Sequence, residues 1–144
     1  MSIRMNFSNT ITNIFIQSSV IYRNFLEKKL EPFQLHSGQI FILISLWETD
    51  GQSQNDLAKK LKVSAPTINK MVKSLAKNSF IECRNCDIDG RVVKIFLTRK
   101  GKDVEPKIEE IWSEMEDLFL LNFTEPEKMI LHQLMEKTFN NLIS

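Results

Sequence analysis

Apolar residues recur at steps of three and four along the first stretch of the chain, residues 6–30. This spacing predicts an amphipathic helix, which Pro32 is expected to end. Three further apolar residues, Ile16, Val20 and Ile21, widen the apolar face beyond one stripe. A helix that is apolar on more than one side is usually buried by a second partner, so we expect this helix to take part in an interface.

Three shorter helices are expected next. Residues 38–49 form a dense apolar run that predicts a second helix, with Ser37 as its cap. Ser53 is the expected cap of a short third helix, and Ser64 is that of a fourth, in which Pro66 stands in the first turn, where proline is tolerated. The fourth helix carries apolar residues on one face and polar or basic residues on the other. Its apolar stripe consists of Ile68, Met71, Val72 and Leu75.

The apolar period changes after residue 79. Residues 80–84 and 91–97 are rich in β-branched and aromatic side chains, and each predicts a strand. The aspartates and the glycine of residues 87–90 are typical of a turn. The two strands are therefore expected to form a hairpin.

The helical period returns beyond the hairpin. Thr98 starts a long helical region, in which Pro106 marks either the beginning of the helix or a kink. Thr124 and Glu127 form a capping box for a last helix. Because no internal repeat or linker interrupts the chain, we expect one domain over residues 1–144, mostly α-helical with a small β-hairpin.

Charge is unevenly distributed along the 144 residues. The whole chain has a net charge of +1. Residues 53–102, however, contain twelve Lys or Arg against four Asp or Glu, a net charge of +8, and the remainder has a net charge of −7. A basic segment inside a nearly neutral chain is typical of a protein that binds a polyanion, although a solvated charged face gives the same pattern.

The sequence lacks the motifs of several enzyme classes. Four glycines cannot supply a dinucleotide-binding fingerprint, no GxSxG occurs, and the only histidines, His36 and His132, do not form an HExxH helix. We therefore expect no enzyme activity, no cofactor and no metal. Residues 1–10 lack the apolar region of a secretory signal, and no apolar run is long enough to span a bilayer. A cytoplasmic protein without a membrane partner is expected.

A short helix, a tight turn, a second helix and a β-hairpin, in this order, are typical of a winged helix-turn-helix. An α-helix fits the major groove of DNA, where the residues at its N-terminus reach the edges of the bases. The fourth helix offers short polar side chains and lysines on its outer face, and the basic hairpin follows it directly. These features favour DNA binding, and the alternative is a winged-helix module that binds another protein.

From Ser53 to Gly101 the chain resembles the MarR family of bacterial transcriptional regulators, and its flanking helices agree with that family in number and length. The matching residues are Ser53-Gln54-Asn55-Asp56-Leu57-Ala58, Ser64-Ala65-Pro66-Thr67-Ile68-Asn69-Lys70-Met71-Val72, Leu75, Asp87-x-Asp89-x-Arg91 and Leu97-Thr98-x-x-Gly101.

The resemblance implies an obligate homodimer that acts on a pseudo-palindromic DNA operator, as a repressor relieved by a small-molecule effector. It implies helical dimerisation parts at residues 1–35 and 103–144, with the first helix and the last two in the interface. The winged helix-turn-helix lobe is then expected at residues 36–102.

Within this lobe, the resemblance implies that Arg91 enters the minor groove, where negative potential is concentrated. Asp87 and Asp89 are expected to stabilise the wing. Together with the outer face of the fourth helix, this defines the expected set of DNA-binding residues. These are Ser64, Ala65, Pro66, Thr67, Asn69, Lys70, Lys73, Arg84, Arg91 and Lys94.

Three positions depart from the family pattern. Cys83 stands where arginine is usual, Ser79 replaces a usual glycine, and Gly90 precedes Arg91 where a second charge is common. These changes reduce the expected number of phosphate contacts. Cys83 and Cys86 also form a CxxC, but residues three apart on a strand point to opposite faces, so we expect an incidental pair. A redox-sensing regulator that uses both thiols is the alternative.

His36 lies in a region that lines a ligand pocket in the MarR family. Phe15, Tyr22 and Trp47 are candidates to line such a pocket together with His36, for a small apolar or aromatic effector. The simpler alternative is that His36 caps the second helix or lies at the surface, and that the aromatic residues belong to the core.

Overall fold

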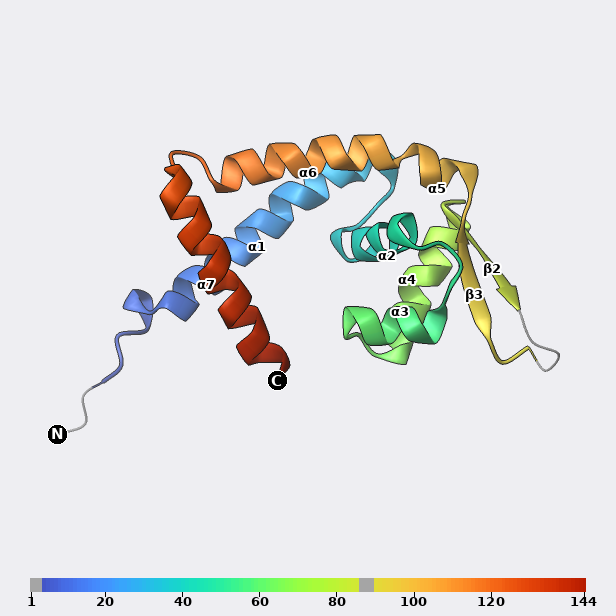
Figure 1. The fold of residues 1–144 in the computed structure, drawn as a ribbon, viewed down its shortest axis with the longest axis horizontal. Helices are drawn as coiled ribbons and strands as arrows, with labels where there is room; N and C mark the ends of the chain where they lie inside the picture. Colours follow the sequence, from blue (N-terminus) through green and yellow to red (C-terminus); the bar gives the residue numbers. More distant parts are fainter. Residues whose placement is uncertain (1–3, 86–89) are drawn as a thin grey trace. The chain divides into compact units, whose positions relative to one another are not determined.

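Seven helices and one small antiparallel sheet make up the described part of the chain, residues 4–85 and 90–144 of a computed structural model (Figure 1). The helices are α1 (Ile11–Leu30), α2 (Ser37–Glu48), α3 (Gln54–Leu61), α4 (Ala65–Lys77), α5 (Arg99–Asp103), α6 (Glu105–Phe119) and α7 (Glu125–Ile143). Short 3-10 turns are η1 (Phe7–Asn9) and η2 (Glu31–Phe33), and the strands are β1 (Gln52–Ser53), β2 (Ile81–Asn85) and β3 (Val93–Leu97). This confirms the predicted mostly helical class with a β-hairpin.

The chain divides into two compact units, residues 1–108 and residues 109–144, which are described separately. The first unit contains α1 to α5, the sheet and the start of α6. The second contains the rest of α6 and all of α7. Within the described residues, no helix combines the length and the hydropathy that crossing a membrane requires.

Side-chain caps begin α3 and α4 as the sequence predicts. Ser53 Oγ accepts a hydrogen bond from the backbone N–H of Asp56 at 3.1 Å, and Ser64 Oγ accepts one from Thr67 at 3.3 Å. These bonds satisfy N–H groups that the first turn of a helix leaves without a partner. The left-handed conformation of Lys62 (φ 55°) ends α3 and makes the turn into α4 tight.

The predicted cap of α2 is wrong by one residue. His36, not Ser37, precedes the first helical residue. The physical reason is that the side chains of Glu27 and Gln39 accept hydrogen bonds from the backbone N–H groups at the start of this helix. The Ser37 N–H donates to Glu27 Oε1 of α1 at 2.8 Å, and the His36 N–H donates to Gln39 Oε1 at 2.9 Å.

The other helix ends follow local signals. The helix predicted over residues 6–30 begins only at Ile11, because Thr10 caps it by accepting from the Asn13 N–H at 3.2 Å. Pro106 is the second residue of α6, so the helix begins near it and does not kink. Thr124 forms the predicted capping box of α7.

The sheet has the order β1-β3-β2 and is antiparallel throughout. The two hairpin strands occur where predicted, within two residues, but the short strand β1 was not expected. Asp50, just after α2, attaches this end of the helix to the sheet. Its Oδ1 accepts hydrogen bonds from the N–H groups of Gly51 at 3.0 Å and Leu97 at 2.9 Å.

The buried side chains of the first unit come mainly from α2, α3, α4 and the sheet. Of the predicted apolar stripe on α4, Ile68, Val72 and Leu75 are buried, while Met71 is partly exposed. The other buried residues of α2, α3 and the sheet include Ile40, Ile42, Leu43, Leu46, Leu57, Ile81, Ile95 and Leu97.

Gly101 packs tightly against the base of the hairpin. A Cβ at this position would overlap the carbonyl oxygen of Phe80, and the Gly101 carbonyl accepts a hydrogen bond from Trp47 Nε1 at 2.9 Å. We expect Gly101→Ala to lower the free energy of unfolding by about 1–3 kcal/mol, the usual scale of overpacking. Urea titration measures this, with the exposed neighbour Lys102→Ala as the control. Equal stability of Gly101→Ala and wild type would contradict the packing described here.

Candidate DNA-binding interface

Helices α3 and α4 pack against each other and are followed directly by the β2–β3 hairpin (Figure 1). The two helices are connected only by residues 62–64. This arrangement is the winged helix-turn-helix that the order of elements predicts. In such a unit the second helix is the one that can enter a groove of DNA.

The outer face of α4 is polar and exposed. Thr67, Asn69, Lys70 and Lys73 are all exposed, whereas the neighbouring Ile68 is buried. The three predicted residues that precede them, Ser64, Ala65 and Pro66, are exposed as well. All seven predicted residues of this helix and its cap are therefore accessible to a partner.

Three of these polar side chains, Ser64, Thr67 and Asn69, contact other polar side chains. Ser64 Oγ and Thr67 Oγ1 lie 2.8 Å apart, so the two hydroxyl groups share a hydrogen bond. Gln54 Nε2, from the first residue of α3, lies 3.5 Å from Asn69 Oδ1. Sequence reasoning missed Gln54. Gln54 directly follows the Ser53 cap, at the N-terminus of the helix that precedes α4. This position is the sequence signal by which Gln54 could have been identified.

The register of the hairpin places two basic side chains next to each other. Arg84 of β2 and Lys94 of β3 are direct partners, so their side chains leave the sheet on the same face. The Arg84 guanidinium lies over the Phe96 ring, 4.3 Å from its centroid, and its Nη2 lies 3.3 Å from Glu82 Oε1. Arg84 is thus braced along the strand by two side chains of the sheet.

Arg91 is exposed and follows Gly90, whose positive φ of 68° suits glycine. Three of the residues predicted to act at the hairpin, Asp87, Asp89 and Cys86, lie outside the described residues. The roles expected for the two aspartates and the CxxC pair therefore stay predictions.

Cys83 lies on the other face of β2, opposite Ile95. Its side chain is exposed, yet partial burial raises the pKa of the thiol above its ordinary value. A raised pKa lowers the fraction of thiolate at neutral pH, and the thiolate is the reactive form. The shift of the pKa therefore does not favour the reactive form of this thiol.

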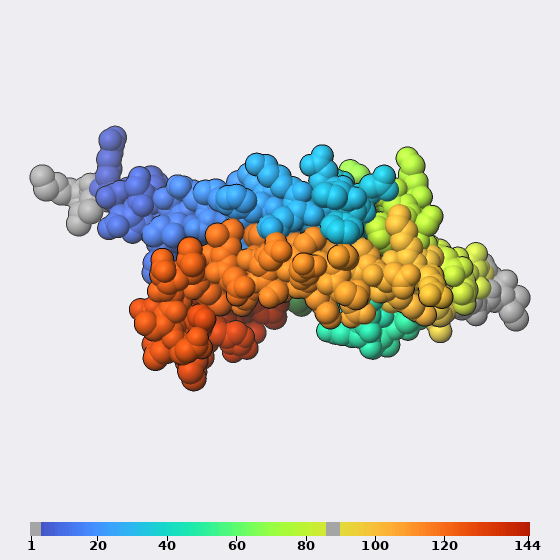
Figure 2. Space-filling model, turned by 90° about the horizontal axis from the view of Figure 1, so that it is seen from above, coloured from blue at the N-terminus to red at the C-terminus, as the bar shows by residue number. Residues whose placement is uncertain are grey.

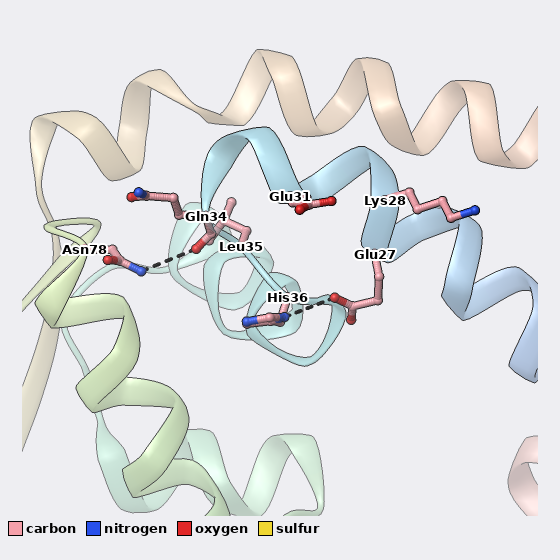
Figure 3. A pocket seen from close by; sticks show the side chains of 7 residues that line it. All are labelled: Glu27, Lys28, Glu31, Gln34, Leu35, His36 and Asn78. Carbon is pink, nitrogen blue, oxygen red and sulfur yellow. Dashed lines mark hydrogen bonds and ion pairs between the residues drawn. The ribbon is translucent and has the colours of Figure 1, made fainter.

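His36 lines a cavity of about 510 Å³ between the end of α1, η2 and the end of α4 (Figure 3). The other lining residues are Glu27, Lys28, Glu31, Gln34, Leu35 and Asn78. The predicted companions Phe15, Tyr22 and Trp47 do not line this cavity, and the structure does not bring the four together there. Trp47 instead donates its indole N–H to the carbonyl of Gly101.

A carboxylate beside the cavity is held in its charged form. Glu27 Oε2 lies 3.1 Å from His36 Nδ1, while Oε1 accepts the hydrogen bond from the Ser37 N–H. Partial burial alone raises the pKa of Glu27, but the hydrogen bonds from Ser37 and His36 outweigh it, and the net pKa lies below the ordinary value.

The fold and this surface define a winged helix-turn-helix transcriptional regulator. The profile of the MarR family matches residues 35–93. The regulator YwoH of Bacillus subtilis is 31% identical over 115 residues, which cover 78% of this chain and 81% of YwoH. The regulator YybA of the same organism is 27% identical over 114 residues, which cover 79% and 76% of the two chains. The chain belongs to the MarR family.

A solved structure agrees with this assignment. The crystal structure of an S. aureus MepR–DNA complex is similar with a TM-score of 0.81 and 26% identity, over 96% of this chain and 99% of that one. The resemblance stated from the motifs of the sequence is thereby confirmed.

The environment of Cys83 predicts low thiol reactivity. In a Cys86→Ser variant, which isolates Cys83, we expect alkylation by iodoacetamide at pH 8 to be slower than that of a cysteine in an unstructured peptide, because the raised pKa leaves less thiolate. The rate should rise through a pH range above that of the peptide. The same variant unfolded in urea is the control, and a faster reaction of the folded protein would contradict the prediction.

Proposed function

We propose that the protein is a homodimeric, sequence-specific DNA-binding regulator, a repressor that a small-molecule effector releases from a pseudo-palindromic operator. The observation that carries the proposal is the exposed polar and basic face of α4, followed directly by a hairpin with Arg84 and Lys94 on one face. The likeness to a MepR–DNA complex supports it. Such a protein acts by binding DNA in the cytoplasm and needs no catalysed reaction.

The exposed residues divide into two roles on DNA. Thr67, Asn69 and Lys70 lie in the first two turns of α4, and short polar side chains there suit the edges of bases in the major groove. Arg91, which lies two residues before β3, suits a narrow minor groove. Lys73, Arg84 and Lys94 are exposed cations, and we assign them to phosphates, which positive charge attracts at any sequence. The exposed segment Ser64–Pro66 would approach the DNA first.

Two helices offer surfaces that a second copy of the chain would cover. In α1, Ile11 is 87% exposed and Ile14 61%, and the α1 side chains lie at the surface of the face shown in Figure 2. In α7, which has no buried residue, Met129 is 65% exposed and Leu142 73%. Exposed apolar surface of this extent on two long helices is typical of an interface.

The cavity beside His36 supports a regulatory ligand. Its volume of about 510 Å³ lies within the range of small-molecule sites. Glu27, Glu31 and Lys28 give it a charged lining, so we propose a small polar or ionic effector for this cavity. An apolar or aromatic effector would need a different site, for which Phe15, Tyr22 and Trp47 are the candidates from the sequence.

The proposal predicts separable effects of two substitutions on DNA binding. A duplex that the wild-type protein selects from a random-sequence pool is the probe. Arg91→Ala should weaken binding by about 1–3 kcal/mol and more strongly for A·T-rich flanks, because a minor-groove arginine reads groove width. Asn69→Ala should instead flatten discrimination among the central bases of each half-site. Fluorescence anisotropy titrations measure both effects.

Salt dependence separates base contacts from phosphate contacts. Removal of a phosphate contact lowers the slope of log K against log salt by about one, and we expect this for Lys73→Ala. Arg23→Ala, an exposed cation on α1, is the control and should leave affinity and slope unchanged. If Arg91→Ala binds every duplex as tightly as wild type, the hairpin does not enter DNA. If the wild-type protein selects no sequence, the alternative that the protein is a protein-binding module is favoured.

The exposed face of α1 predicts a dimer that a single charge can weaken. Light scattering should give a mass of twice 16.8 kDa at micromolar concentration. Ile14→Glu, which buries a charge if the interface forms there, should shift the protein toward monomer. Asn24→Glu adds the same charge to a polar, exposed position of the same helix and should not. A stable wild-type monomer would contradict the proposed dimer.

A further inference from the structure

Gln39 is a polar side chain buried inside the first unit. It is 3% exposed, and with Ser45 it forms the pair of buried polar residues in the described part of the chain. Both ends of its carboxamide are engaged. Oε1 accepts the hydrogen bond from the His36 N–H at 2.9 Å, and Nε2 donates to Ser74 Oγ of α4 at 2.9 Å. The second bond joins residues 35 positions apart.

Beside this bond, a side chain of α4 packs closely against the start of α2. A Cβ on Gly38 would lie 3.2 Å from Met71 Sδ of α4, which is tighter than ordinary contact. One turn beyond Ser74, Asn78 Nδ2 donates to the carbonyl of Gln34 at 3.4 Å (Figure 3). Polar contacts therefore connect the start of α2 and the loop before it to the C-terminal half of α4.

These polar contacts supply what the apolar stripe of α4 cannot. The burial of Ile68, Val72 and Leu75 is favourable but not directional, so it tolerates a small rotation or shift of the helix. A hydrogen bond is directional and falls off steeply with angle and distance. Ser74 follows Lys70 by one turn on the same side of α4. A displacement of α4 at Ser74 would therefore move the side chains that face DNA.

We propose that Gln39 is a positioning residue for sequence-specific DNA binding, which fixes the rotation and axial position of α4 through Ser74. The inference rests on the proposed role of α4 in reading bases. The same end of α2 is bonded to α1, because the Ser37 N–H donates to Glu27. Gln39 thus helps to fix the position of α4 relative to α1, the helix that we propose for the dimer interface. The spacing of the two half-sites on DNA must match the spacing of the two α4 helices in the dimer.

Ser74→Ala, Ser74→Thr and Gln39→Met test the inference. The probes are the duplex selected by the wild-type protein from a random pool and a shuffled duplex of equal length. Ser74→Ala and Gln39→Met should each lower the ratio of the two affinities by about three- to tenfold, the scale of one hydrogen bond. The salt slope should not change, because no phosphate contact is lost. Ser74→Thr keeps the hydroxyl and should keep most of the ratio.

The double variant and a matched control exclude a general loss of stability. Gln39→Met with Ser74→Ala should lower the ratio no further than Gln39→Met alone, because Gln39→Met already removes the bond to Ser74 together with the bond from the His36 N–H. Ser45→Ala removes the other buried polar group of α2, whose Oγ lies 3.5 Å from Nε2 of Gln52, the first residue of β1. It should lower the free energy of unfolding without changing the ratio.

The outcomes separate this inference from the proposed function. A wild-type ratio in Ser74→Ala, or equal losses in Ser74→Ala and Ser45→Ala, would overturn the positioning role while leaving DNA binding intact. Failure of the wild-type protein to select any sequence would overturn the proposed function and this inference with it.

Discussion

One-sided burial of α4 determines which side chains of the lobe are available to DNA. Ile68, Val72 and Leu75 are at most 2% exposed, and they stand at i, i+4 and i+7, along one side of the helix. Burial of each such side chain is worth about 1.5–3 kcal/mol, more than a typical hydrogen bond contributes. The apolar stripe therefore decides which face of α4 points inward. Thr67, Asn69 and Lys70 are exposed as a consequence.

The hairpin is anchored at its base by contacts distributed over the first unit. The Thr98 N–H donates to the carbonyl of Phe80 at 3.1 Å, and Lys100 Nζ donates to that of Asn78 at 2.7 Å while it lies over the Phe80 ring. Asp50 holds β3 from the end of α2. Since residues 78–80 directly follow α4, these bonds attach the hairpin to the end of that helix. The cations of the sheet consequently keep a defined place beside it.

The sequence was sufficient for several features that depend on neighbours within a few residues. The Ser53, Ser64 and Thr124 caps bond three residues ahead, and the stripe of α4 follows from helical periodicity, so these elements and the exposed face of α4 were predictable. Pro106 left two alternatives, and the structure selects a helix that begins beside it.

The features that sequence reasoning missed depend on residues far apart in the chain. Glu27 lies nine or ten residues before its partners His36 and Ser37, and this contact moved the start of α2. Strand β1 exists because β3 offers it an edge, and two residues carry no strand signal of their own. Phe15, Tyr22 and Trp47 do not line the cavity beside His36, and Trp47 instead donates its indole N–H to the distant carbonyl of Gly101. Periodicity gives the face of a residue but not its partner across the fold.

The start of α2 is the point where the surface cavity, α1 and α4 are connected by hydrogen bonds. Glu27 lines the cavity and holds Ser37, while two residues further on Gln39 holds Ser74. Coupling between two sites in a regulator is typically about 1–3 kcal/mol, and one net hydrogen bond is worth about 0.5–1.5 kcal/mol. The loss or gain of one or two bonds along this path is therefore of the size that regulation needs. A ligand that competes for the Glu27 carboxylate would act on bonds of this strength, without having to displace the apolar stripe that keeps α4 folded against the lobe.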